Sequence, residues 1–223
     1  MDLRNYQSNQ LVTEISNQKV NLFYGPDGRK RELFSKQLSD KLIESVATID
    51  VKTRSLSNFC KAGCSHCCCH FFKTTSTEAT AITYYLLTNE EILSKFIDNF
   101  IAIQNNYPYK LQLREECDPS DREQTKEAND KYFQQKIPCD FLVDGLCIIY
   151  ETRPLVCSAY IAFAPGRICS FEPKGYIPKE INKVFLDTKY WFEVQARIRY
   201  KGQPESITNW SQRIIENLLT GDF

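Results

Sequence analysis

The segment "NFCKAGCSHCCCHFF", residues 58–72, decides how this sequence is interpreted. It holds five of the ten cysteines and both histidines of the chain within fifteen positions. A chain of 223 residues can bury a core of adequate size, so it does not need disulfides to compensate for a small one. The concentration of cysteine therefore indicates a chemical role.

The spacing of these cysteines is typical of metal ligands. Cys64 and Cys67 are separated by two residues, so one tight turn can direct both sulfurs at one metal. Adjacent residues in extended backbone point to opposite sides, so we expect Cys67 and Cys68 to serve two different metal centres, or two irons. The pattern predicts a polynuclear or paired site.

Composition limits the partners and the compartment. The 28 basic and 28 acidic residues cancel and form no long block of one sign, which argues against a nucleic-acid partner. The first residues lack a signal-peptide pattern, and no apolar stretch is long enough to cross a membrane. We expect a cytoplasmic protein with no membrane partner. Cytosolic thiols stay reduced unless a metal binds them, and the triplet at 67–69 cannot pair internally without strain.

Most of the chain shows helical patterns. Apolar residues recur at helical spacing through 29–50 and again through 180–220, where a stop is expected at Gly221. The sequence "TSTE" at 75–78 is a capping box for a further helix, which Asn89 is expected to break in two. The polar segment 114–136 predicts an exposed connection with one solvated helix.

One β-hairpin is expected in "PCDFLVDGLCIIY", residues 138–150. Two β-prone runs flank the Asp-Gly pair at 144–145, which suits a two-residue type I′ turn. This turn places Cys147 opposite Leu142, with Cys139 on the other face of the ladder. Both cysteines can reach one site only if the strand twists or ends near Pro138.

Cys157 follows the hairpin in "RPLVC". Pro154 suits the first position of a helix, so Cys157 is expected near a helix start, where the helix dipole favours a thiolate. Any one of Cys139, Cys147 and Cys157 could instead be a small buried apolar residue. That alternative is weaker for three cysteines spaced around one hairpin.

Together these motifs resemble a known family. "NFCKAGCSHCC", followed by "PCDFLVDGLCIIYETRPLVCSAY", is similar to the YkgJ-type cysteine cluster proteins, described as zinc- or iron-chelating, over about residues 58–170. The sequence departs from the family at Ser158, where an arginine is common, and at Cys69, which extends the usual pair to a triplet. The resemblance implies metal ligands at Cys60, Cys64, Cys67, Cys68, Cys139, Cys147 and Cys157, and Cys169 resembles a later cysteine of some members.

The resemblance implies a metal-binding protein whose biochemical role is largely undefined. The alternative is an iron-sulfur-dependent protein-modifying enzyme, because the flagellin lysine N-methylases carry a similar cluster. Thiolates suit either zinc or an iron-sulfur cluster, and eight thiols exceed the needs of one closed zinc site, which slightly favours iron-sulfur. We expect one mainly α-helical domain over residues 1–223 with one small hairpin, a compact cysteine-cluster metal-binding domain.

The sequence argues against two other catalytic classes. The Cys60-x3-Cys64-x2-Cys67 spacing also occurs in radical S-adenosylmethionine enzymes, but the β/α units and the G-x-G pair that those enzymes need are missing. Nucleophilic catalysis would need His66 or His70 as a base. We favour hydrogen-bonding or surface roles for these histidines over ligation. The sequence leaves open whether Cys69, Cys117, His66 or His70 bind metal, names no protein partner and identifies no catalytic residue.

Overall fold

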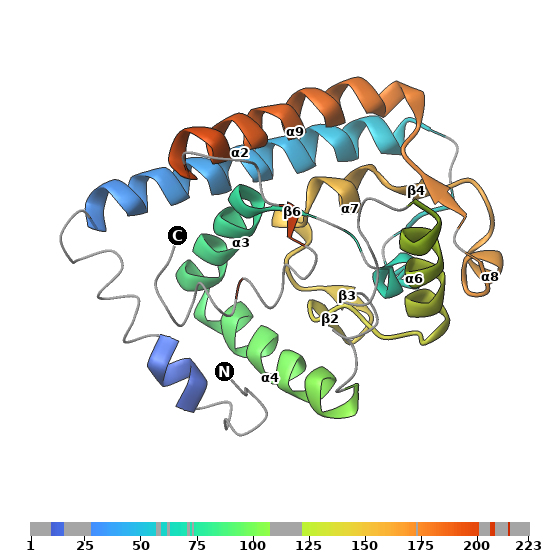
Figure 1. Cartoon of the computed structure of the whole chain (residues 1–223), viewed down its shortest axis with the longest axis horizontal. Coiled ribbons are helices and arrows are strands. Elements are labelled where there is room, and N and C mark those ends of the chain that lie inside the picture. The colour runs from blue at the N-terminus through green and yellow to red at the C-terminus, as the bar shows by residue number, and fades with distance from the viewer. Residues whose placement is uncertain are drawn as a thin grey trace.

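The computed structural model is mainly α-helical, as predicted, with three small two-stranded antiparallel pairs among the described residues (Figure 1). No helix in the described part of the chain has the length and hydropathy to cross a bilayer. Residues 108–121, which include Cys117, lie outside it. The structure describes residues 10–15, 28–56, 59–61, 63–70, 72, 74–107, 122–172, 174–200, 206–207 and 214.

Two long helices form one edge of the molecule. Helix α2 (Gly28–Arg54) and helix α9 (Lys179–Tyr200) run antiparallel and side by side (Figure 1). Leu38, Leu42 and Ile49 of α2 recur at helical spacing and are fully buried, so this face of the helix packs on the core. The helix predicted over 29–50 is confirmed.

Helices α3 (Ser76–Thr88) and α4 (Glu90–Asn106) follow the cysteine segment. Thr75 caps α3: its hydroxyl accepts from the Glu78 backbone N–H, and the Glu78 carboxylate accepts from the Thr75 N–H. Asn89 ends α3 and begins α4. The predicted capping box and the predicted break are both confirmed.

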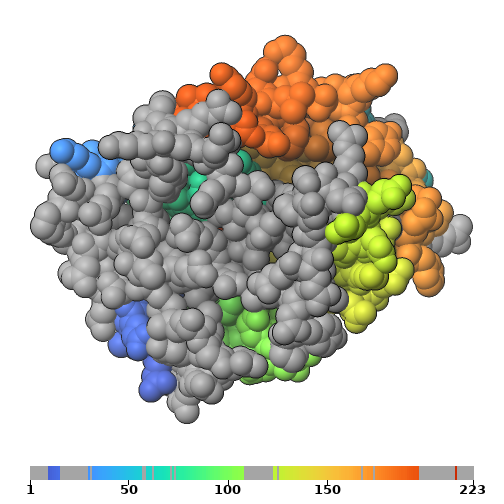
Figure 2. Space-filling view, viewed as in Figure 1, coloured from blue at the N-terminus to red at the C-terminus, as the bar shows by residue number. Residues whose placement is uncertain are grey.

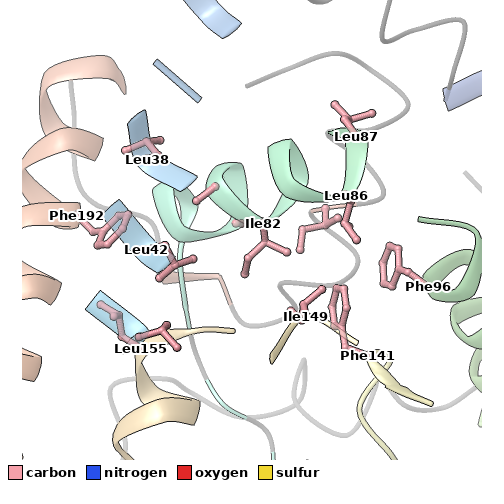
Figure 3. Packing of buried hydrophobic residues seen from close by; sticks show 14 of the residues in the cluster. Leu38, Leu42, Ile82, Leu86, Leu87, Phe96, Phe141, Ile149, Leu155 and Phe192 are labelled. Atoms are coloured by element: carbon pink, nitrogen blue, oxygen red, sulfur yellow. The ribbon is translucent and has the colours of Figure 1, made fainter. Parts of the chain in front are cut away.

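Helix α3 crosses the centre of the core. Ile82 and Leu86 of α3 point toward Ile149, while Phe192 of α9 faces Leu42 of α2 (Figure 3). Phe96 of α4 stacks on Phe141, with ring centroids 4.4 Å apart. Because Phe141 and Ile149 flank the hairpin, this packing fixes the hairpin on the helices.

The predicted hairpin consists of β2 (Leu142–Val143) and β3 (Leu146–Cys147). Its turn residues Asp144 and Gly145 have φ of 50° and 77°, as a type I′ turn requires. The other two pairs were not predicted. They are β4 (Ile161–Ala162) with β5 (Gly175–Tyr176), and β1 (Thr74–Thr75) with β6 (Ser206–Ile207).

The C-terminal helix is shorter than predicted. The helix expected over 180–220 is not continuous, because α9 ends at Tyr200 and Ile207 pairs with Thr74 in a strand. The other residues beyond 200, except the helical and buried Ile214, lie outside the described part. Periodicity did not reveal the strand because its partner is far away in the sequence.

Helix α6 (Arg122–Gln134) is the helix expected within 114–136, but it is not wholly solvated. Tyr132 and Phe133 are each only 3% exposed. In the space-filling view the yellow-green residues of α6 lie at the surface beside the orange segment that contains helix α8 (Gly166–Cys169) (Figure 2). One face of α6 therefore covers the end of the molecule where the cysteines lie.

Glu78 joins two segments that flank the cysteines. Its carboxylate accepts from the N–H of Thr75 at 3.0 Å and from the N–H of Leu155, 77 positions away, also at 3.0 Å. Leu155 begins helix α7 (Leu155–Ala159), which carries Cys157. The cap of α3 thus positions the start of α7.

We expect Glu78→Gln to lower the free energy of unfolding by about 1–3 kcal/mol, because one amide oxygen cannot serve both buried N–H groups. Urea unfolding followed by circular dichroism measures the change. Glu91→Gln is the matched control, since Glu91 forms only an exposed pair with Lys95 and should change stability by less than about 0.5 kcal/mol. Equal effects of the two substitutions would contradict this role of Glu78.

Candidate metal centre

The first cysteine block is a turn followed by a short 3-10 helix. Gly63 has φ of 81°, which a residue with a side chain rarely adopts, and the Cys64 N–H closes the turn on the Lys61 carbonyl at 3.0 Å. The 3-10 helix η2 (His66–Cys69) comes next. The segment therefore presents its cysteines from a turn and from successive positions of a tight helix, not from extended backbone.

In the second block, Cys139 precedes the hairpin and Cys147 lies within it, and both pack against the main hydrophobic core. Cys147 pairs with Leu142, as predicted. Strand β2 begins only at Leu142, whose N–H bonds to the Cys139 carbonyl at 2.9 Å. Cys139 thus lies in a turn before the strand, and the alternation of faces along the ladder does not separate it from Cys147.

Cys157 is the third residue of the short helix α7, after Pro154, which caps that helix. The helix start is confirmed, but the expected effect on the thiol is not. Burial, with the nearby thiols of Cys139, Cys67 and Cys147, raises the pKa of Cys157 well above its ordinary value. Desolvation outweighs the dipole of a helix this short, so a bound cation would be needed to keep the thiolate.

Four thiols from separate segments form what we call the core group. Cys139 and Cys147 pack against the main hydrophobic core. Electrostatic interactions connect Cys157 with both of them and connect Cys68 with Cys139 and Cys157, and Cys67 also acts on Cys147 and Cys157. The core group consists of Cys68, Cys139, Cys147 and Cys157.

The other four predicted ligands line a small pocket and are called the pocket group. The pocket has a cavity volume of about 20 Å³, and its wall also includes His66, His70, Tyr160 and Lys174. Each thiol of this group lies near others of the group, because Cys60 and Cys169 both interact with Cys64 and Cys67. The pocket group consists of Cys60, Cys64, Cys67 and Cys169.

Cys67 lies where the two groups meet. The Cys68 thiol donates a hydrogen bond to the Cys67 sulfur, and this bond is the main cause that lowers the pKa of Cys67 and raises the pKa of Cys68. Cys67 lines the pocket, whereas Cys68 does not. The two groups are therefore in direct contact through adjacent residues of η2.

A buried ion pair adjoins the thiols. The Arg153 guanidinium pairs with the Asp50 carboxylate of α2, bonds to the Tyr150 carbonyl and stacks on the Tyr150 ring at 3.8 Å. Its charge opposes the effect of burial on the pKa of Cys147 and Cys157. The pair was not predicted from the sequence. Asp50 follows the buried Val46 by about one helical turn, so its carboxylate lies on the same side of α2 and needs a partner there.

The histidines differ in their surroundings. His70 stacks on Phe133 with ring centroids 4.7 Å apart, and burial with Lys136 lowers the pKa of His70 to about 4. His70 is thus a neutral aromatic ring at neutral pH. His66 packs close to Gly166, where an added Cβ would lie 3.2 Å from its Nε2. Both histidine rings line the pocket beside the four thiols.

Cys169 and Cys60 are held at the pocket by the segment around β4. The Ala162 N–H donates to the Cys60 sulfur at 3.2 Å, and the Cys169 thiol donates to the Ala164 carbonyl at 3.7 Å. Burial raises the pKa of both thiols, while the Ala162 N–H acts in the opposite direction on Cys60. This backbone donor could not be predicted from the sequence, because it depends on the unpredicted strand.

Gly175 allows the Tyr160 ring to pack directly against the backbone at this pocket. A Cβ added there would lie 2.1 Å from Cε1 of Tyr160, so the ring could not keep its place. We expect Gly175→Ala to lower the free energy of unfolding by about 1–3 kcal/mol through overpacking. Gly166→Ala should cost less, since its Cβ would meet only the edge of His66 at 3.2 Å. Thermal unfolding of both variants measures the difference, and an undisturbed Gly175→Ala protein would contradict the packing.

The residue types at this site suit a metal, but their described positions do not bring three donors to one point. Among the described residues, no three His, Cys, Asp or Glu side chains are arranged so that they could hold one ion together. None of the nine described cysteines is in a disulfide. Two groups of four thiols, a backbone N–H directed at one sulfur and a guanidinium beside the other group match what thiolate ligands need. The sulfurs must move closer together for a metal to bind.

The comparisons with known proteins add no assignment. No protein-family model, curated protein or solved structure matches this chain. The fold and the site define a mainly α-helical protein in which two sequence-distant cysteine blocks meet beside a small hairpin.

Proposed function

We propose that this protein binds metal through cysteine thiolates at two adjoining centres, the core group and the pocket group. The observation that carries the proposal is the convergence of cysteines predicted as ligands from distant parts of the sequence, since Cys60, Cys64, Cys67 and Cys169 line one pocket and Cys67 interacts with Cys147 and Cys157 of the second block. Four thiolates are the complement of one zinc ion or of one iron-sulfur cluster. The proposed partner is therefore a metal ion or cluster.

The resemblance to the YkgJ-type proteins supports the same proposal and the same ligands. A cytoplasmic location is part of it, because reduced thiols are available to metals there. Arg153 supports it physically, since two thiolate-bound centres carry negative charge that a buried guanidinium can offset. The protein would hold the metal through Cys60, Cys64, Cys67 and Cys169 in one group and through Cys68, Cys139, Cys147 and Cys157 in the other.

The alternative, an iron-sulfur-dependent protein-modifying enzyme, needs space for a substrate beside the metal. The pocket at the described cysteines has a volume of about 20 Å³, which is room for about one water molecule. A peptide side chain or a nucleoside cofactor is much larger. A pocket of this size has room for an ion and not for a protein substrate, which favours metal binding over catalysis on a protein.

Metal and acid-labile sulfide analysis of protein purified without oxygen tests the proposal. We expect stoichiometric bound metal that the thiol groups account for, either as zinc without colour or as iron with matching sulfide and a visible chromophore. Replacing a ligand cysteine by serine should lower the metal content. A folded protein that holds no zinc and no iron would contradict the proposal.

A further inference from the structure

Exposed apolar side chains gather at the end of the molecule that carries β4 and α8 (Figure 1). Four of them lie within fourteen positions of sequence, between 163 and 176. Single exposed apolar residues are normal on a protein, whereas a group of them marks an interaction site. We call this group the apolar surface; it consists of Phe59, Phe163, Ile168, Phe171 and Tyr176.

Ring and backbone contacts hold the centre of the apolar surface together. The Phe163 and Tyr176 rings stack with centroids 5.2 Å apart, because the pairing of β4 with β5 brings their two segments side by side. The Phe59 N–H donates to the Ala162 carbonyl at 3.0 Å, which places Phe59 beside the residue that precedes Phe163. Segments about a hundred positions apart therefore contribute to one surface.

The exposed fractions of these side chains indicate a protein partner and not a membrane. Four of the five are between 36% and 54% exposed, so each lies partly against the protein. Phe171 alone projects, at 86% exposed. A membrane-binding surface inserts its apolar side chains into the lipid boundary, which half-covered rings cannot do. Rings that lie flat instead present a face on which the side chains of a partner can pack.

The charges near the apolar surface are mainly positive. Segments 51–61 and 163–180 contain six basic residues and two acidic ones, and one of the acidic residues, Glu172, already pairs with Lys174 at 2.6 Å. Lys61 and Lys179, which lie two and three positions after Phe59 and Tyr176, are both exposed. Two copies of this surface would repel each other, whereas acidic side chains would complement it. The charge therefore favours an acidic partner over a second copy of this chain.

We propose that the apolar surface binds an acidic segment of another protein that also carries aromatic or aliphatic side chains. Those side chains pack on the exposed rings, and the carboxylates pair with the lysines around them. Phe59 precedes Cys60 and Ile168 precedes Cys169, so the bound segment lies beside the pocket. The proposal goes beyond metal binding and does not depend on it, since none of these contacts needs a metal.

Fluorescence anisotropy of a labelled copolymer of glutamate and tyrosine tests this proposal on the full-length protein. We expect saturable binding that added salt weakens, because salt screens exposed charges. Polyglutamate, which lacks apolar side chains, should bind at least about fivefold more weakly, and a copolymer of lysine and tyrosine should not bind. Absence of binding by the glutamate–tyrosine copolymer would overturn the proposal.

Substitutions locate the binding. Phe171→Ser and Tyr176→Ser should each weaken binding of the glutamate–tyrosine copolymer by about fivefold or more, and Lys61→Glu should remove much of its salt dependence. Because Phe171 is highly exposed, its replacement should leave the fold intact, which circular dichroism checks. Tyr190→Ser and Lys95→Glu are the matched controls, since both residues are exposed on helices outside the apolar surface, and both variants should bind as the wild type does.

Three further results would overturn the proposal. Binding that Phe171→Ser and Tyr176→Ser leave unchanged would place the copolymer elsewhere on the protein. Binding to phosphatidylserine vesicles but not to the copolymer would identify a membrane as the occupant. A dimer in sedimentation that Phe171→Ser dissociates would identify a second copy. None of these results depends on metal content, so this proposal and the proposed metal binding fail independently.

Discussion

Cys157→Ser is expected to remove the metal of the core group and to lower stability more than any other single change in this protein. Cys157 belongs to α7, which packs on both α2 and α9, so a metal bound there ties the hairpin and the cysteine turn to the helical core. Structural zinc contributes on the order of 10 kcal/mol to the folding of small thiolate sites. Serine has nearly the same size but is a poor ligand.

The measurement is urea unfolding of wild type and variant, each with and without a chelator. Chelator should lower the stability of the wild-type protein strongly and that of the variant much less. The variant has already lost the metal bound by Cys157, which contributes most to stability. Cys69→Ser should respond to chelator as the wild type does. If Cys157→Ser keeps the wild-type metal content and the wild-type response to chelator, Cys157 is not a ligand.

The second large effect is expected at the buried pair of Arg153 and Asp50. Both residues are less than a tenth exposed, at 7% and 8%. Arg153→Met would leave the Asp50 carboxylate buried without its cation, which costs about 3–5 kcal/mol. The same change removes the positive charge beside Cys147 and Cys157, so we also expect weaker metal binding.

Asp50→Asn separates these two consequences. It also breaks the ion pair and lowers the stability of the apo protein, but it leaves the guanidinium free to offset thiolate charge. Metal should therefore restore more stability to Asp50→Asn than to Arg153→Met, and chelator competition should give the weaker affinity for Arg153→Met only. Arg153→Lys, which keeps the charge, should lie between. Equal metal affinities of Arg153→Met and Asp50→Asn would show that the pair is structural only.

Local signals in the sequence predicted the parts of the fold that depend on neighbouring residues. The Thr75–Glu78 capping box, the break at Asn89 and the Asp144-Gly145 turn each act over a few positions, and each is confirmed. The register of Leu142 with Cys147 followed from that turn.

Features that depend on distant partners could not be predicted in this way. The pairing of Thr74 with Ile207 joins segments more than a hundred positions apart, and it replaced part of a helix expected from periodicity. The Ala162 donor to Cys60 and the close approach of Gly175 to Tyr160 both depend on the β4–β5 pair, which has no turn signal of its own. These contacts hold Cys60 and Tyr160 in the wall of the pocket.

The cysteines illustrate the same distinction. Their spacing predicted ligands, but the prediction that Cys67 and Cys68 serve different centres assumed extended backbone, and these residues lie in a 3-10 helix instead. In the structure, Cys169 lies with Cys60, Cys64 and Cys67 of the first block at the pocket, and Cys68 interacts with Cys139 and Cys157 of the second block. This arrangement depends on how distant segments pack around η2, which spacing alone does not predict.

X-ray absorption at the metal edge of the purified protein tests the central claim most directly, because it reports the atoms bound to the metal. The account predicts a first shell made of sulfur at about 2.3 Å, with short metal–metal distances only if an iron-sulfur cluster is present. The shell should lose sulfur in Cys157→Ser and in Cys169→Ser. A first shell of nitrogen or oxygen in the wild-type protein would contradict thiolate ligation and the function built on it.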